Sequence, residues 1–315
     1  QHYQLAAVSA LLAGVAGWNW YMLVNRDNWY MSPINEWGRA RPELIDVFKR
    51  LIRLFEEIDP PALTKLSDTA IALDILDRSS EIGGFDDPLR TACYHADIDY
   101  ECFDLASGAI EKPVLLYSGH RWMQASAQRR LLNYVESGGH VVFFDQLPVL
   151  DDTLSPCNLL NLREPDSILT GANLTIDLGG QRCDVSVPRL FSYQAVPGEA
   201  INAVRRMDSG LHAEEQRILF SLPVGLRYVT GYRERRGAGS IIVLGVPPSP
   251  SLLVALHQWI GVPLYSRAHL EGVSTALYRS GTPNEFYLII ANNRPDPVDT
   301  YIDLTRSLFD APMLE

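Results

Sequence analysis

Residues 125–145 read ASAQRRLLNYVESGGHVVFFD, and this stretch decides the fold class. It predicts a helix over Ala125 to Glu136. The helix ends at Ser137-Gly138-Gly139, because glycine adopts the left-handed conformation that commonly closes helices. A strand follows from His140 to Asp145. A helix that leads directly into a strand is typical of an α/β fold.

The same pattern extends to both sides of this stretch. The elements predicted there are, in chain order, strands over Thr69 to Leu76, Asp97 to Leu105, Pro113 to Tyr117 and Gly239 to Val246, and a helix over Ser251 to Ile260. Strands that alternate with helices in this way predict a doubly wound, flavodoxin-like sheet.

Two β-rich regions interrupt or follow the α/β pattern. From about Leu159 to Tyr232, alternating segments such as LTIDLGG and CDVSVPRLFSY predict a β-rich insertion. The later segments VSTALYRSG and EFYLIIANN predict an antiparallel hairpin that opens a small β-domain. We therefore expect a flavodoxin-like domain over residues 61–264 with its insertion at about 159–235, and the start of a C-terminal β-domain over 265–315.

Residues 1–60 predict helix, strand, loop and helix. The predicted elements are a helix over Leu5 to Val15, a strand over Asn19 to Val24, a long loop to Arg41, and a second helix from Glu43 to about Ile58. Pro42 suits the first position of that helix, which carries apolar residues on one face. One and a half β/α units cannot bury their own apolar faces, so we expect this region to be the edge of a larger fold.

Composition limits the classes of partner. The chain has 315 residues, 47% of them hydrophobic, a formal net charge of -11 and a pI near 5.1. Its length allows about two or three compact units. The negative charge argues against nucleic-acid and anionic-membrane partners, because both surfaces would repel it. No apolar run is long enough to span a bilayer, and no basic segment opens a secretory signal.

The sequence predicts neither a metal site nor a cofactor. Its cysteines, Cys93, Cys102, Cys157 and Cys183, contain no C-x-x-C pair. Their spacing fits neither a zinc site nor a dense disulfide framework, although it leaves a Cys93–Cys102 disulfide open. We expect reduced thiols in a cytoplasmic protein. The glycine pairs are too short for a phosphate-binding loop.

A family resemblance lies in Gly17 to Leu44, GWNWYMLVNRDNWYMSPINEWGRARPEL. This segment resembles the eighth strand, its loop and the eighth helix of the (β/α)8 barrel in glycoside hydrolase families 35 and 42, the β-galactosidase group. It keeps the aromatic strand motif as Asn19-Trp20-Tyr21-Met22. It has Asn25-Arg26-Asp27-Asn28 where family 35 has a Gly-Thr-Asn loop. The order of barrel end, a domain similar to class I amidotransferases and a small β-domain is similar to family 42 and archaeal family 35 enzymes.

The resemblance implies the C-terminal part of a retaining exo-glycosidase that acts on terminal β-galactoside or β-glucosaminide bonds. It places both catalytic carboxylates upstream of Gln1, so we expect this chain alone to be inactive. It also implies a homo-oligomer, an oligosaccharide or small glycoside as substrate, and dependence on an N-terminal barrel segment.

The loop residue types suit a sugar. Side chains at the C-terminal ends of barrel strands face the active site, and a pyranose offers C–H faces and hydroxyls that indoles, amides, guanidinium groups and carboxylates bind. The tryptophans of the segment, Trp37 among them, would supply the stacking surfaces. The predicted substrate-binding residues are Asn25, Arg26, Asp27, Asn28, Trp29 and Glu36. For Trp18 and Met22 we favour core packing, whereas Arg26 and Asp27 could equally form a loop ion pair.

Glu36 lies in Asn35-Glu36-Trp37-Gly38, which mimics the N-E-Y-G motif that carries the acid/base of this clan. A retaining glycosidase needs a second carboxylate about 5 to 5.5 Å away, and no further barrel units follow Glu36 to supply one. We therefore interpret Glu36 as a rim or substrate-binding residue, or as a partner of Arg39 or Arg41.

Two other functions remain open. The flavodoxin-like region could belong to a degenerate glutamine amidotransferase, with Ser118 and His120 at the turn LLYSGHRWM. No glycine precedes Ser118 as a nucleophile turn requires, which favours a loop serine. The chain could also be a non-catalytic carbohydrate-binding or assembly module.

Overall fold

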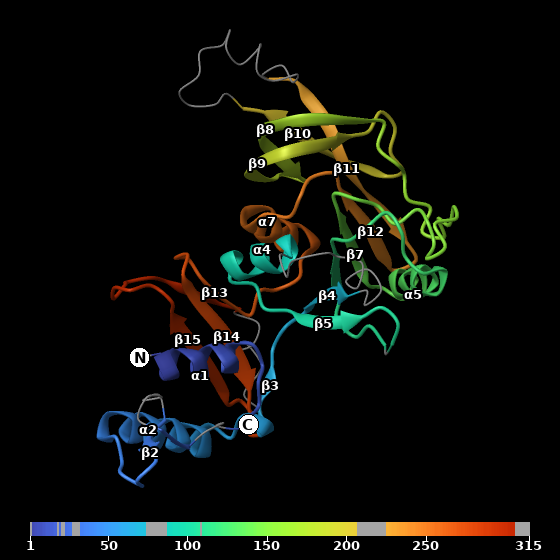
Figure 1. Cartoon of the computed structure of the whole chain (residues 1–315). Helices are drawn as coiled ribbons and strands as arrows, with labels where there is room; N and C mark the ends of the chain where they lie inside the picture. Colours follow the sequence, from blue (N-terminus) through green and yellow to red (C-terminus); the bar gives the residue numbers. More distant parts are fainter. Residues whose placement is uncertain are drawn as a thin grey trace, which may run out of the picture. The chain divides into compact units, whose positions relative to one another are not determined.

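The computed structural model describes residues 2–17, 19, 23–26, 32–73, 87–107, 109–206 and 225–305. Predicted residues Asp27, Asn28 and Trp29 lie outside these ranges. The chain divides into two compact units (Figure 1). We call residues 67–264 the sheet unit, and residues 1–66 together with 265–315 the terminal unit.

Among the described residues, nine strands of the sheet unit form one mixed sheet with the order β5-β4-β6-β7-β12-β11-β10-β8-β9. The fold is therefore α/β with a large mixed sheet. The strands are β4 (Thr69–Leu73), β5 (Glu101–Asp104), β6 (Val114–Tyr117), β7 (His140–Phe144), β8 (Ser167–Leu178), β9 (Gln181–Ser192), β10 (Glu199–Arg205), β11 (Arg227–Arg236) and β12 (Gly239–Leu244).

Five neighbouring strands, from β5 to β12, run parallel. Numbered along the chain, they have the order 2-1-3-4-5, which is the order of the doubly wound sheet of flavodoxin. The strands predicted at Pro113 to Tyr117 and His140 to Asp145 are confirmed to within one residue at each end. The strand predicted from Asp97 is shorter and begins at Glu101, because Asp97 has a left-handed backbone (φ 52°) that closes the preceding helix.

Helices cover both faces of the parallel strands. Helices α4 (Pro88–Ala96) and α7 (Pro250–Ile260) lie side by side on one face, and α5 (Ala125–Glu136) packs on strands β7 and β12 (Figure 1). Successive residues of a strand point to opposite faces. In β12, Ile242 and Leu244 accordingly join the core with α4 and α7, whereas Ile241 and Val243 join the core with α5. Helix α5 has the predicted bounds.

Helix α4 was not among the predicted elements. It has nine residues, and it begins with a signal that the sequence contains. Asp87 precedes Pro88, and its carboxylate accepts hydrogen bonds from the backbone N–H groups of Leu89 (3.0 Å) and Arg90 (3.2 Å). A capping aspartate followed by proline is a helix start, since the carboxylate accepts from free N–H groups of the first turn and proline has no N–H that needs a partner. Four of its residues are buried against the sheet, and those contacts stabilise so short a helix.

The β-rich region continues the sheet beyond β12. Strands β8, β9, β10 and β11 pair antiparallel with one another, and β11 pairs antiparallel with β12. The antiparallel strands therefore extend the sheet from the β12 edge of the parallel strands. The turn between β11 and β12 contains Gly237 at φ 56°. A Cβ there would lie 2.4 Å from the backbone oxygen of Glu136, so the turn requires glycine.

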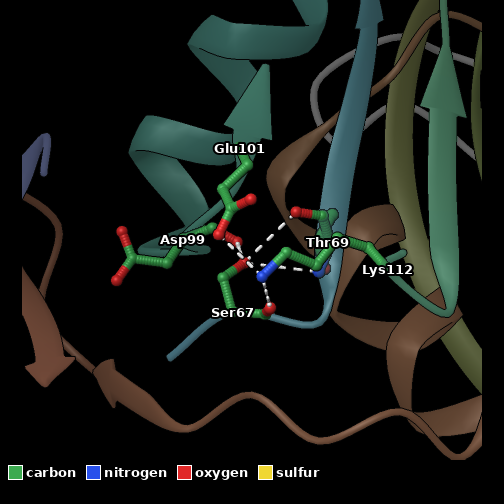
Figure 2. Close-up of polar contacts among 5 residues, drawn as sticks. All are labelled: Ser67, Thr69, Asp99, Glu101 and Lys112. Carbon is green, nitrogen blue, oxygen red and sulfur yellow. Dashed lines mark hydrogen bonds and ion pairs between the residues drawn. The ribbon is translucent and has the colours of Figure 1, made fainter. Parts of the chain in front are cut away.

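A polar network ties the amino ends of β4, β5 and β6 together (Figure 2). The Lys112 ammonium donates to the backbone oxygen of Ser67 at 2.7 Å and lies 2.6 Å from a carboxylate oxygen of Glu101. The Ser67 hydroxyl donates to the backbone oxygen of Asp99 at 2.8 Å. This edge of the sheet is therefore occupied by contacts that fix the strands.

The terminal unit joins segments from both ends of the chain. Its elements are α1 (His2–Leu12), β1 (Val24–Asn25), β2 (Ile34–Asn35), α2 (Pro42–Ile58), a 3-10 turn (Pro60–Ala62), β3 (Thr64–Lys65), β13 (Ser266–Ala268), β14 (Val273–Arg279), β15 (Phe286–Asn292) and β16 (Ile302–Leu304). Strands β14 and β15 form the predicted antiparallel hairpin, and β3 pairs with β14. The predicted second helix is confirmed as α2, and the first helix begins and ends three residues earlier than predicted.

The C-terminal end of α1 is held by the other segments of its unit. The Lys65 ammonium donates to the carbonyl oxygen of Leu12 at 2.5 Å, and the Tyr278 hydroxyl donates to that of Leu11. The last carbonyls of a helix lack the usual intrahelical partners, and the two side chains supply donors to them; the Leu11 carbonyl also accepts from the Gly14 N–H at 2.9 Å. Tyr3 of α1 packs edge-on against Phe48 of α2, with ring centroids 5.2 Å apart.

The four cysteines are free thiols, and Cys93 and Cys102 form no disulfide. Cys93 is buried in α4, and burial raises the pKa of its thiol. Within the described residues, no helix is long and apolar enough to cross a membrane.

His257 in α7 links the helix layer to the sheet and predicts a pH dependence of stability. The side chain is fully buried, its Nδ1 lies 2.8 Å from the carbonyl oxygen of Leu253, and its Nε2 lies 2.8 Å from the Thr69 hydroxyl. Because a carbonyl only accepts, Nδ1 carries the proton and Thr69 donates to Nε2 of a neutral ring. Burial lowers the pKa of His257.

We expect His257→Gln to reduce the dependence of the free energy of unfolding on pH below about pH 7. The unfolded chain protonates His257 below about pH 6.5 while the folded chain does not, so up to about 1.4 kcal/mol of stability is lost for each pH unit until the lowered pKa is reached. Urea unfolding between about pH 7 and pH 5 should therefore show a steeper loss in the wild type than in the variant. His95→Gln, on the exposed side of α4, should keep the wild-type slope. Equal slopes for the wild type and His257→Gln would contradict this assignment.

Candidate functional site

The loop before α2 is organised by Asn35. Its side-chain oxygen accepts hydrogen bonds from the backbone N–H groups of Trp37 (3.1 Å) and Arg39 (2.8 Å). Gly38 completes the turn with φ 75°. Asn35 is buried, so the turn has one fixed conformation and its neighbours point outward. An asparagine that closes a turn through its own side chain is a common local motif.

Glu36 and Trp37 are the residues that this turn presents to solvent. Trp37 is 64% exposed, which is unusual for the largest apolar side chain and leaves its ring free for stacking. Glu36 is exposed too, and within the described residues its carboxylate has no hydrogen-bond or ion-pair partner. The predicted pairing with Arg39 or Arg41 is therefore wrong. Arg41 instead donates to the Ser32 hydroxyl at 2.8 Å, which ties the two ends of the loop together.

Asn25 and Arg26 lie on the other side of this loop. The predicted strand over Asn19 to Val24 is only in part described; what the structure has is a short strand β1 at Val24–Asn25, paired in parallel with β2. The pairing of Asn25 with Asn35 brings the two ends of the predicted sugar loop side by side. The Asn25 side-chain oxygen accepts from the backbone N–H of Arg26 at 2.7 Å, and Arg26 is exposed. The described loop residues thus supply an amide, a guanidinium group, a carboxylate and an indole.

Ser118 and His120 follow β6 at the carboxyl edge of the sheet. Strand β6 ends at Tyr117, and α5 begins only at Ala125. A nucleophile elbow requires a sharp, strained turn directly from strand to helix, and Ser118 is not among the residues with positive φ. The Ser118 hydroxyl has no hydrogen-bond partner in the described part of the chain, and the His120 ring stacks on Trp122 (centroids 6.0 Å apart, planes at 14°). This arrangement does not activate a serine.

The carboxyl edge of β7 borders a cavity of about 620 Å³. Its lining combines segments from four parts of the sheet unit: Arg121 after β6, Asp145 and Gln146 after β7, Glu164 before β8, and Arg189 in β9. The loops at the carboxyl ends of parallel strands are where doubly wound sheets bind ligands.

Two ion pairs cross this cavity lining. Arg189 donates through its Nε to a carboxylate oxygen of Asp145 at 3.0 Å and pairs through a second nitrogen with the other oxygen. This bidentate contact raises the pKa of Arg189. Its guanidinium also lies 5.7 Å from the centroid of the Phe191 ring. Arg121 pairs with Glu164. In the described part of the chain, no group of histidine, cysteine, aspartate or glutamate side chains could hold a metal ion.

Sequence comparison finds a similarity to a known family in part of the sheet unit. Residues 77–163 match the family model described as GLMA-like, second domain. This range includes α4, β5, β6, α5 and β7, so it contains Ser118 and Asp145 at the carboxyl edge of the sheet. No curated protein matches the chain in sequence.

Solved structures extend the similarity to most of the chain. A β-galactosidase from Bacillus circulans sp. alkalophilus matches with a TM-score of 0.60 at 17% identity, over 83% of this chain and 41% of its own. The cold-adapted β-galactosidase from Rahnella sp. R3 matches with a TM-score of 0.62 at 13% identity, over 84% and 42%. Gan42B, a GH42 β-galactosidase from G. stearothermophilus, matches with a TM-score of 0.58 at 12% identity, over 83% and 40%.

The chain has the fold of the C-terminal part of a family 35/42-like β-galactosidase. It spans about two fifths of the length of these enzymes. The expected likeness of the chain to this enzyme group is thus confirmed at the level of fold by matches that cover more than four fifths of the chain. The low identities carry no information about the sugar that is bound.

Sequence reasoning did not find the cavity of this β-galactosidase-like sheet unit. Its residues come from separate segments, and Arg189 lies in β9, where alternating polar residues indicated only a strand. One signal was available: Asp145 ends the buried strand HVVFFD, and a carboxylate at the carboxyl end of a parallel strand is placed at the ligand-binding edge.

We expect Ser118→Ala to leave the turnover of the intact enzyme near the wild-type value, because Ser118 lacks both the strained turn and a hydrogen-bonded base. His120→Ala should behave in the same way. Steady-state kinetics of the complete enzyme, with thermal unfolding of each variant as a folding control, checks this. A loss of more than about a hundredfold in kcat for a folded Ser118→Ala protein would establish a nucleophile.

Proposed function

We propose that this chain is the C-terminal portion of a retaining exo-glycosidase that hydrolyses terminal β-galactoside or β-glucosaminide bonds. One observation carries the proposal: the fold of more than four fifths of the chain matches β-galactosidases, while the chain spans about two fifths of their length. The catalytic glutamate pair then belongs to a segment N-terminal to Gln1. The glycosidase-like neighbours support a carbohydrate as the substrate.

In this proposal residues 1–60 are the last β/α unit of a (β/α)8 barrel, followed by the flavodoxin-like domain at 61–264 and the β-domain at 265–315. The exposed apolar residues of the first segment support a missing partner. Leu23 before β1, Val24 in β1 and Ile52 on α2 are each about half exposed. Of the apolar face of α2, only Phe48 and Leu51 are buried. Further barrel units would cover the remaining apolar surface and gain its burial free energy.

The loop from Asn25 to Glu36 then faces the sugar. A loop between a barrel strand and the following helix lies at the catalytic face. The turn at Asn35 leaves Glu36 and Trp37 exposed, and among the described residues the Glu36 carboxylate has no hydrogen-bond or ion-pair partner. We assign substrate binding to Asn25, Arg26, Asp27, Asn28, Trp29 and Glu36, with Trp37 as a further stacking surface. A homo-oligomer is part of the same proposal.

The first test concerns the chain by itself. The purified chain of 315 residues should show no measurable turnover of nitrophenyl β-galactoside or nitrophenyl β-glucosaminide, whereas the protein extended by its N-terminal barrel segment should hydrolyse one of them. Turnover by the chain alone that disappears in Glu36→Gln would overturn the proposal and make Glu36 a catalytic residue.

The second test concerns the loop in the complete enzyme. Trp29→Ala should remove a stacking surface and Asn28→Ala a hydroxyl contact, each at a cost of about 1 to 3 kcal/mol in transition-state stabilisation, measured as kcat/KM. Tyr301→Ala is the matched aromatic control, because Tyr301 is 83% exposed in a different part of the terminal unit. Unchanged kcat/KM in both loop variants would show that the aromatic residues serve packing alone.

A further inference from the structure

The cavity at the carboxyl edge of β7 has a size and a lining that fit a small polar ligand. Its volume of about 620 Å³ lies in the range of about 300 to 1,000 Å³ typical of ligand pockets. A second cavity of about 540 Å³ shares Glu164 with it and extends past Arg163 toward Pro197. The two neighbouring cavities offer room for more than one ring.

The charges of the lining favour a neutral ligand. Arg121 and Arg189 are each neutralised by a carboxylate, from Glu164 and Asp145 respectively. An anion such as phosphate would have to displace one of these carboxylates and leave it unpaired beside another acidic side chain, Asp166. A neutral ligand can instead accept from the guanidinium edges and donate to the carboxylate oxygens while both ion pairs remain.

The lining also holds hydrogen-bonding groups that the protein does not use. Within the described residues, neither the Gln146 amide nor the Ser167 hydroxyl has a side-chain hydrogen-bond partner, and both line the cavity. An amide offers two donors and one acceptor oxygen, and a hydroxyl offers one donor and its lone pairs. Together with the two ion pairs they match the mixed donors and acceptors of several neighbouring hydroxyl groups.

Apolar surface lies beside these groups. Ile168 is 65% exposed at the cavity, and the Phe191 ring and Leu147 complete the apolar part of the lining. The exposed Ile168 side chain is therefore available to contact an apolar part of a ligand. The C–H face of a pyranose is apolar while its rim carries hydroxyls, and this is the combination that the cavity presents.

Contacts within the protein hold the Asp145 carboxylate in the cavity lining. Asp145 has a left-handed backbone (φ 61°), which is uncommon for a residue other than glycine, and this conformation ends β7. The bidentate contact with Arg189 and the position of that guanidinium over Phe191 then hold the carboxylate. A strained residue at the end of a strand, beside a cavity, points to a ligand-binding role.

We propose that this cavity binds a neutral saccharide of one or two rings, through residues of the sheet unit other than those of the loop to which we assign substrate binding. The Gln146 amide and the Ser167 hydroxyl bind hydroxyls, and Ile168 contacts the ring face. The proposal rests on the lining alone and does not require this chain to hydrolyse a glycosidic bond.

The test is a titration of the complete chain of 315 residues with lactose, in which binding is measured by isothermal titration calorimetry and by saturation-transfer NMR. We expect lactose to bind, and Gln146→Ala to weaken the affinity by about threefold to tenfold, as for one lost hydrogen bond. Since the Gln146 amide has no hydrogen-bond partner among the described residues, this variant should keep the wild-type melting temperature. Gln181→Ala, at the exposed first residue of β9, is the matched control and should bind like the wild type.

Three results would overturn the proposal. The first is no lactose signal at concentrations at which the protein stays folded. The second is lactose binding of equal strength in the wild type and in both Gln146→Ala and Ser167→Ala, which would place the sugar elsewhere, for example at the Asn25 to Glu36 loop. The third is binding of inorganic phosphate in place of lactose, which would contradict the neutral ligand. None of these results bears on hydrolysis by the complete enzyme, which the nitrophenyl glycosides test separately.

Discussion

Strand β12 is the constraint on which the sheet unit depends. It pairs in parallel with β7 on one side and antiparallel with β11 on the other, so it joins the two halves of the sheet. Every residue from Ser240 to Leu244 is fully buried, and Ile241 and Ile242 belong to different cores. A Cβ at Gly239 would lie 2.0 Å from the backbone oxygen of Gly139, so only glycine allows the strand to start where it does. A strand with neighbours on both edges and apolar faces on both sides has no freedom of register, because a shift by one residue would exchange the two cores.

The amino and carboxyl edges of the parallel strands differ in what they contact. At the amino edge, Ser67, Glu101 and Lys112 contact one another and fix β4, β5 and β6 (Figure 2). At the carboxyl edge, the segments after β6 and β7 open instead onto a cavity, and they meet there with β8 and β9 because those strands extend the sheet from β12. The antiparallel strands therefore complete the lining of a cavity that the parallel strands alone would leave open on one side. The Asp145–Arg189 ion pair is the contact that joins the two halves at this edge.

The terminal unit follows a different principle, in which distant segments satisfy one another's backbone groups. Tyr278 and Lys65 donate to the last carbonyls of α1, and β3 adds to the hairpin of β14 and β15. Near α2, Asn35 serves its own turn instead of a neighbouring element. Its local hydrogen bonds hold Glu36 and Trp37 in an exposed position, which is how a loop can keep polar and aromatic groups free for a ligand.

The sequence by itself determined the elements whose signal is local. The periodicity of α2 and α5, the apolar runs of β6, β7 and β12, and the alternation of β14 and β15 each follow from neighbouring residues. The motif in Gly17 to Leu44 also indicated the family resemblance that the solved structures share. Tertiary structure alone decided the strand order and the second partner of β12. It also decided that Arg41 donates to Ser32 and not to Glu36, and that Arg121, Asp145 and Arg189 line one cavity. These features depend on contacts between residues far apart in the chain, and no local pattern of side chains encodes which distant segment will satisfy a strand edge or a charge.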